Sequence, residues 1–342
     1  MKKIFFSLVA LAALAACSKS EIAYEQTGEI GFVPVAKKAT KVAEDDAVYN
    51  TNLDMYIFAN TYTDTDETSF TQPYFANARF EHREDGIFGG ADAVYYWPNV
   101  KTLKFAGLSA SGNVNNGATP KLTANLEIQL DGYAPGTGGA EEGDNDLMWF
   151  PTTQAYGKSD VPGTGNTATT DDNIEVVMQH ACAWVTINIK GDDVTGADTN
   201  PWTITNVSFN DLSQSGNVLL GTIANWTSVA AGAPCTVFAG TKPLEANVAN
   251  FTQIGNFKDL IVVPQSTKKL YVTYEYDSDP QSTTIPTFSE TKEIELTYNT
   301  TGNTWNAGIH YIYNITIGTT EILVEPTVTP WADPAIEEDI EF

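Results

Sequence analysis

Hydrophobic and polar residues alternate along several stretches of this chain, mostly in its second half. Residues 183–190 read Ala-Trp-Val-Thr-Ile-Asn-Ile-Lys, and the same period of two recurs at 270–276, 293–298 and 310–317. A period of two is that of a β-strand with one buried and one solvent-exposed face, whereas an amphipathic helix has a period of 3.6. The pattern therefore predicts an all-β protein.

Two stretches poor in large apolar residues interrupt these strands. Residues 157–173 are almost entirely small or polar, and residues 133–146 are rich in glycine and acidic residues. Such stretches are typical of loops and linkers, and a chain of 342 residues is expected to form two domains. We predict an N-terminal β-sandwich domain at 28–172 and a C-terminal one at 173–342, both built from antiparallel sheets.

The N-terminus has the layout of a bacterial secretory signal peptide. Two lysines precede an apolar run at residues 4–14, which is shorter than the about 20 residues that a membrane-spanning helix needs. The run leads into Leu14-Ala15-Ala16-Cys17, the form of a lipobox, in which the cysteine thiol receives a diacylglycerol. We predict a signal peptide at 1–16, lipidation of Cys17, and a lipid-anchored tether at 17–27 that holds the protein to a membrane.

The chain is strongly acidic, with a formal net charge of −25 from 18 basic and 43 acidic residues. Such a surface repels nucleic acid, so we expect no nucleic-acid partner. Beyond Cys17 the sequence has two cysteines, Cys182 and Cys235. An exported protein can form a disulfide between them, and two buried free thiols are the alternative.

No recognisable catalytic or cofactor-binding motif appears in the sequence. The three histidines, His82, His180 and His310, are far apart and fit no metal-ligand spacing. Oxygen ligands for calcium cluster at 64–66 and 144–146, but neither stretch has the spacing of an EF-hand loop. We therefore predict no enzymatic activity, no catalytic residues, no cofactor and no metal site.

Several short motifs follow one another in order over nearly the whole mature chain. They are Ile30-Gly31-Phe32, Tyr95-Tyr96-Trp97-Pro98 with Leu103-Lys104-Phe105-Ala106, Asp146-Leu147-Met148, Gln179 to Val185, Leu260 to Gln265, Trp305 to Gly308 with Tyr311-Ile312-Tyr313, and Val328 to Trp331. Together they resemble the fimbrillin family of Bacteroidetes, the subunits of protease-processed (type V) pili.

The resemblance implies two tandem transthyretin-like (Greek-key) β-sandwich domains and export as a lipoprotein to the outer membrane and cell surface, as part of a fimbria. It also implies that a protease removes the first strand and that a strand of another pilus subunit, identical or different, fills the groove left behind. Ile30 and Phe32, which share one face, mark the removable strand. Pro34 has no N–H for a ladder hydrogen bond, which suits an edge position.

A basic cluster after this strand offers processing sites at Lys38 and Lys41. The sequence departs here from an arginine-specific pattern, because its arginines are Arg79 and Arg83. Cleavage after either arginine would fall inside the fold. We therefore expect a lysine-tolerant protease, or an unprocessed tip or anchor subunit.

Two other functions compete with a structural or adhesive fimbrial subunit. A glycan-binding lipoprotein of a nutrient-uptake system would show an exposed tryptophan platform, for which Trp226 is the best candidate. A surface glycoside hydrolase would place two carboxylates opposite each other across a cleft.

Overall fold

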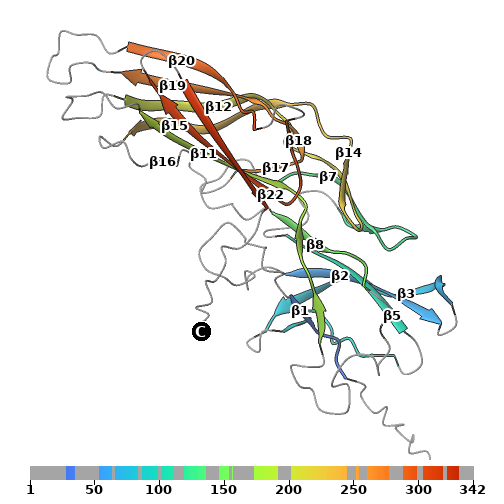
Figure 1. Cartoon of the computed structure of the whole chain (residues 1–342). Coiled ribbons are helices and arrows are strands. Elements are labelled where there is room, and N and C mark those ends of the chain that lie inside the picture. Colours follow the sequence, from blue (N-terminus) through green and yellow to red (C-terminus); the bar gives the residue numbers. More distant parts are fainter. Residues whose placement is uncertain are drawn as a thin grey trace, which may run out of the picture.

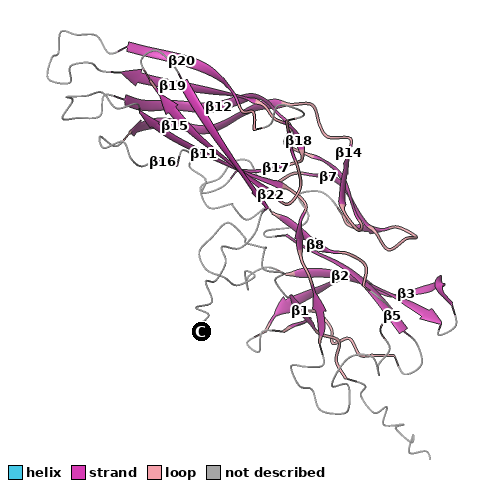
Figure 2. Ribbon diagram, in the orientation of Figure 1, coloured by secondary structure: helices cyan, strands magenta, loops and turns pink. Residues whose placement is uncertain are grey.

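The computed structural model describes residues 28–34, 54–63, 66–83, 87–98, 102–110, 119–135, 146–153, 156, 173–191, 202–244, 252–253, 260–276, 288–298, 303–318 and 322–330. In this described part every regular element is a strand, and the strands form five sheets (Figure 2). The predicted all-β class is confirmed. No helix in the described ranges is long and apolar enough to cross a membrane.

The largest sheet contains most strands of the N-terminal half. Its order is β10 (Gln179–His180), β8 (Leu147–Phe150), β5 (Thr102–Ala110), β2 (Met55–Thr63), β3 (Asp66–His82), β4 (Phe88–Gly90), β1 (Phe32–Pro34) and β9 (Ile174–Val176). The first and last strands of this order are separated in sequence only by Val177 and Met178. β9 and β10 are thus neighbours in the sequence but form the two opposite edges of the sheet.

A core rich in aromatic side chains packs on the buried face of this sheet. Its buried members come from β1 to β5, β8 and β9 and from the segments next to them, and include Phe32, Phe80, Phe88, Trp97, Phe105 and Phe150. Aromatic rings bury large apolar areas, so few residues per strand suffice to stabilise the packing.

The C-terminal half is a sandwich of two sheets (Figure 1). One has the order β16 (Thr252–Gln253), β11 (Ala183–Gly191), β22 (Ile309–Ile317) and β23 (Ile322–Pro330), with β17 (Leu260–Val262) also paired to β11. The other has the order β15 (Ala233–Pro243), β12 (Trp202–Leu212), β19 (Lys269–Tyr276) and β20 (Phe288–Glu295). Buried residues from both sheets form one core.

The alternating pattern in the sequence corresponds to alternating burial in these strands. Along β11 every second residue is buried, so that Val185, Ile187 and Ile189 enter the core while the residues between them are half-buried. The strand predicted at 293–298 is displaced, because β20 ends at Glu295.

The expectation of purely antiparallel sheets is wrong. β11 pairs with β22 in parallel, from Trp184 opposite His310 to Gly191 opposite Ile317, and β1 pairs with β9 in parallel. Alternating burial is compatible with either direction, since it depends on which face is covered and not on the orientation of the neighbouring strand.

A small sheet joins residues from both halves of the chain. Its order is β14 (Ala224–Thr227), β13 (Gly216–Leu220), β7 (Ile128–Tyr133) and β6 (Lys121–Leu122), and β13 pairs with β7. A remaining pair consists of β18 (Gln265–Ser266) and β21 (Thr304–Trp305). Strand pairs thus cross the predicted boundary between residues 172 and 173, and two tandem domains remain a prediction.

Candidate functional site

The N-terminal strand β1 lies between two other strands. On one side Phe32–Pro34 pair in parallel with Ile174–Val176 of β9, and on the other Phe32 is opposite Phe88 of β4. The predicted edge position for this segment is therefore wrong, because β1 has a neighbouring strand on each side. Only one residue of β1 is in register with β4, so the pairing on that side is short.

Hydrogen bonds continue on both sides of the chain just before β1. The Ile30 amide donates to the Tyr95 carbonyl over 2.8 Å, and the Ile174 amide donates to the Gly31 carbonyl over 2.9 Å. Residues 28–34 are thus held as an extended segment inserted into the sheet.

The side chains of this segment complete the aromatic core. Ile30 and Phe32 are both 0% exposed. The Phe32 ring has its centroid 5.2 Å from those of Phe80 and Phe105, in edge-to-face geometry, and 6.1 Å from that of Phe150. Removal of the segment would therefore leave an apolar groove lined by these rings.

An ion pair fixes the start of the inserted segment. Arg83 Nη2 lies 2.6 Å from Glu29 Oε1, and both side chains are about one-third exposed. At such exposure an ion pair contributes on the order of 1 kcal/mol or less. A Cβ on Gly89 would lie closer than 3.0 Å to the Arg83 guanidinium, so this glycine leaves the space that the guanidinium occupies.

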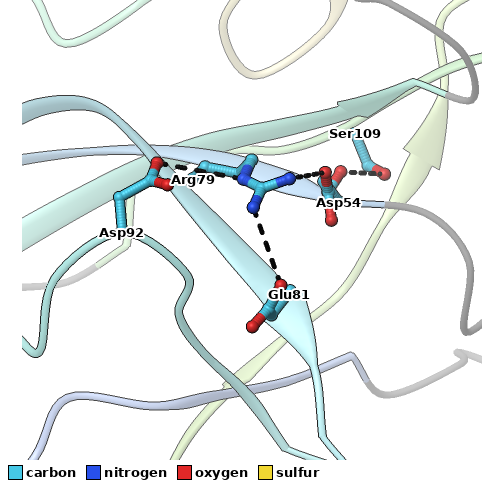
Figure 3. A network of polar contacts seen from close by, with 5 residues as sticks. All are labelled: Asp54, Arg79, Glu81, Asp92 and Ser109. Atoms are coloured by element: carbon cyan, nitrogen blue, oxygen red, sulfur yellow. Dashed lines mark hydrogen bonds and ion pairs between the residues drawn. The ribbon is translucent and has the colours of Figure 1, made fainter.

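The second arginine, Arg79, belongs to a network of polar contacts at the exposed side of β3 (Figure 3). Arg79 of β3 lies 3.1 Å from Asp54, 3.7 Å from Glu81 and 3.8 Å from Asp92, and Ser109 Oγ donates to the backbone carbonyl of Asp54. Because Arg79 is paired on β3, cleavage after it would fall inside the fold, as expected from the sequence. Three residues predicted as functional, Cys17, Lys38 and Lys41, lie outside the described residues.

The described tryptophans offer no exposed platform for a sugar. Trp226, the best candidate, is half-buried and donates from Nε1 to the Ala181 carbonyl over 2.6 Å. Trp184 is also half-buried, and the others described are buried: Trp97, Trp149, Trp202 and Trp305. The glycan-binding alternative therefore gains no support from this part of the chain.

A buried polar pair that no sequence motif indicated lies at the edge of the first sheet. His180 Nδ1 of β10 contacts Asp146 Oδ2, next to β8, and both side chains are almost fully buried. Burial and the neighbouring Asp146 raise the pKa of the Cys182 thiol well above its usual value, so this cysteine is a poor nucleophile. The buried contact between His180 and Asp146 therefore has a structural role.

The described residues contain neither a cluster of metal ligands nor a disulfide. Across these ranges no group of three or more His, Cys, Asp or Glu side chains could hold a metal ion. Cys182 and Cys235 are buried free thiols. The sequence left open a disulfide or two free thiols, and the structure has the free thiols.

Comparisons with known proteins agree on one family and one fold. A family profile described as fimbrillin-like matches residues 40–331, and a profile for the prokaryotic membrane lipoprotein lipid attachment site matches residues 1–18, which contain Cys17. A search of curated protein sequences found no match.

Solved structures of Bacteroides proteins are similar in fold. A fimbrial protein from Bacteroides vulgatus is 14% identical with a TM-score of 0.61, the match covering 89% of this chain and 99% of that one. A candidate cell adhesion protein from Bacteroides uniformis is 15% identical with a TM-score of 0.55, over 89% and 98% of the two chains. One from Bacteroides ovatus is 11% identical with a TM-score of 0.53, over 90% and 99%.

Proposed function

Because the chain belongs to the fimbrillin-like family, we propose that it is a structural subunit of a fimbria that assembles by exchange of its first strand. The family and the lipoprotein attachment site make it a membrane-anchored fimbrial protein of the cell surface. In the proposed assembly, loss of β1 opens the groove around Phe32, and an extended segment of a neighbouring subunit fills it.

One observation carries this proposal: a very short segment supplies two fully buried side chains to the core. Residues 28–34 include the three residues of β1, and within this segment Ile30 and Phe32 are 0% exposed and the backbone is hydrogen-bonded on both sides. A groove of this kind offers unpaired backbone groups and apolar pockets for alternate side chains when the segment leaves. These are the two features by which an extended peptide binds through β-strand addition.

Processing would have to separate this segment from the rest of the chain. Lys38 and Lys41 follow β1 directly in sequence, and we propose them as the cleavage sites of a lysine-tolerant protease. Cys17 is the proposed lipid acceptor of the precursor. Cleavage after either lysine would release the lipid together with the first strand, and would convert an anchored precursor into a subunit ready for assembly.

Intact mass spectrometry of the protein from its own cell surface, combined with electrophoresis without boiling, tests this function. We expect a mature chain that starts near Ala39 or Val42 and runs as a heat-labile ladder. A chain that starts at acylated Cys17 and runs as a monomer would contradict assembly by strand exchange. A variant with Lys38→Gln and Lys41→Gln should remain unprocessed, whereas Arg79→Lys, which keeps the positive charge on β3, should be processed normally.

A further inference from the structure

We infer that the groove occupied by residues 29–32 selects an incoming strand by four consecutive residues: an acidic residue, an aliphatic residue, glycine and an aromatic residue. The inference rests on the proposed strand exchange and names the partner segment for it. The occupant is an extended segment of a neighbouring subunit that carries this order. In the present chain the groove is filled by Glu29-Ile30-Gly31-Phe32 itself.

The glycine is required by space. A Cβ added to Gly31 would lie 2.8 Å from Ile87 Cγ2 and still closer to Asn173 Oδ1. Gly31 is not among the glycines with a positive φ, so its backbone conformation is open to other residues. A side chain at this position would therefore have to displace the side chains of Asn173 and Ile87, whereas glycine enters without displacing them.

The acidic residue is read by Arg83. This arginine lies directly after β3, with its guanidinium packed against the backbone of Gly89 and 2.6 Å from Glu29. Departure of residues 28–34 removes the Glu29 carboxylate from this guanidinium. An incoming segment regains the ion pair only if it has a carboxylate one residue before its aliphatic residue. In a chain with 43 acidic and 18 basic residues, a cation at the groove also counters the repulsion between two acidic subunits.

The aliphatic and aromatic positions are selected by their packing in the hydrophobic core. Side chains two residues apart on an extended segment point to the same face, so Ile30 and Phe32 enter the groove together while Glu29 and Gly31 do not. The rings of Phe80 and Phe105 meet the Phe32 ring edge to face, which favours an aromatic residue over an aliphatic one at this position.

Peptide exchange on the cut, full mature chain tests the inference. A recognition sequence for a site-specific protease is inserted after Lys38, the folded protein is cut, and the bound N-terminal segment is displaced by a fluorescent peptide with the sequence of residues 28–35.

We expect this native peptide to bind. The Gly31→Ala peptide should bind at least about tenfold more weakly, and the Glu29→Gln peptide about two- to fivefold more weakly. The control peptide Val33→Thr, changed at a half-buried position, should stay within about twofold.

Two compensating protein variants separate recognition from general loss of packing. Asn173→Gly removes the nearer of the two neighbours of the glycine position and should recover part of the binding that the Gly31→Ala peptide loses. Arg83→Glu should bind a Glu29→Lys peptide better than the native peptide, which reverses the preference of the unchanged protein. Since each comparison is made within one folded protein, a change in protein stability cannot produce it.

The possible outcomes separate the inference from the proposed function. Binding of the native peptide together with equal binding of the Gly31→Ala and Glu29→Gln peptides would overturn the sequence preference and leave strand exchange intact. Failure of the native peptide to displace the cut segment would overturn strand exchange, and the inference with it.

Discussion

Trp184 of β11 and His310 of β22 stack face to face, with ring centroids 3.4 Å apart and planes 3° apart. The two residues are directly opposite each other at the start of the parallel pair between these strands. Thr186 Oγ1 lies 2.9 Å from His310 Nε2. Burial against the indole lowers the pKa of His310 from 6.5 to about 4, because a protonated imidazole would lose its hydration there.

This pKa shift makes the stability of the protein pH-dependent in a defined window. Well above pH 6.5 the imidazole is neutral in both the folded and the unfolded chain, so it does not change the stability there. As the pH falls from about 6.5 to about 4 the unfolded chain binds a proton that the folded chain does not, and stability decreases. Because His310 is only partly buried, we expect a loss of about 1 kcal/mol over this window.

Urea unfolding at pH 7 and pH 4.5 measures this loss, with His310→Gln as the comparison. The glutamine keeps a hydrogen-bonding group near Thr186 but does not titrate. The free energy of unfolding of the variant should fall less between the two pH values than that of the unchanged protein. The carboxylates are the same in both proteins, so their titration contributes equally to the two falls. An identical fall in both proteins would show that His310 is not protonated on unfolding.

Phe32→Ala should destabilise the uncut protein strongly. The substitution leaves a cavity among Phe80, Phe105 and Phe150, and such truncations of a buried phenylalanine cost about 3–5 kcal/mol. The matched control is Phe288→Ala on β20, whose side chain is 56% exposed and should cost about 0.5 kcal/mol or less. Denaturant unfolding of both variants makes the comparison, and equal losses would show that β1 is not part of the stable core.

Removal of one member of the buried Asp146–His180 pair should cost more than removal of both. Asp146→Ala leaves the imidazole without its carboxylate partner in a buried place, which typically costs about 3 kcal/mol or more. The double variant Asp146→Leu with His180→Phe replaces the pair by apolar groups and should recover part of that loss. Thermal unfolding of the two variants tests this order, and a double variant less stable than Asp146→Ala would contradict it.

A second peptide from this chain probes the glycine position. Residues 339–342 read Asp-Ile-Glu-Phe, which repeats the acidic, aliphatic and aromatic residues of 29–32 but has Glu341 in place of glycine. These C-terminal residues lie outside the described part, so the prediction rests on the groove alone. In the exchange assay, a peptide of residues 334–342 should bind at least about tenfold more weakly than the native peptide, and Glu341→Gly should restore binding.

Local pattern was enough to identify many of the strands and the compartment. The alternation at 183–190 specifies β11 because every second side chain needs cover, a requirement that each strand carries in its own residues. The basic start, apolar run and cysteine of the first 17 residues likewise determine the lipoprotein signal without reference to the fold. The ordered motifs indicated the family, and the fimbrillin-like profile over residues 40–331 confirms it.

Only the tertiary structure decided which strands and side chains meet. Nothing in the local pattern indicates that β11 and β22 run parallel, that β1 has a neighbouring strand on each side, or that β7 pairs with β13. Glu29 and Arg83 are 54 residues apart in sequence, and Asn173 approaches Gly31 because the adjoining strand β9 pairs with β1. Burial periodicity depends on residues two apart in one strand, whereas pairing and side-chain space depend on distant segments whose contacts leave no periodic trace in the sequence.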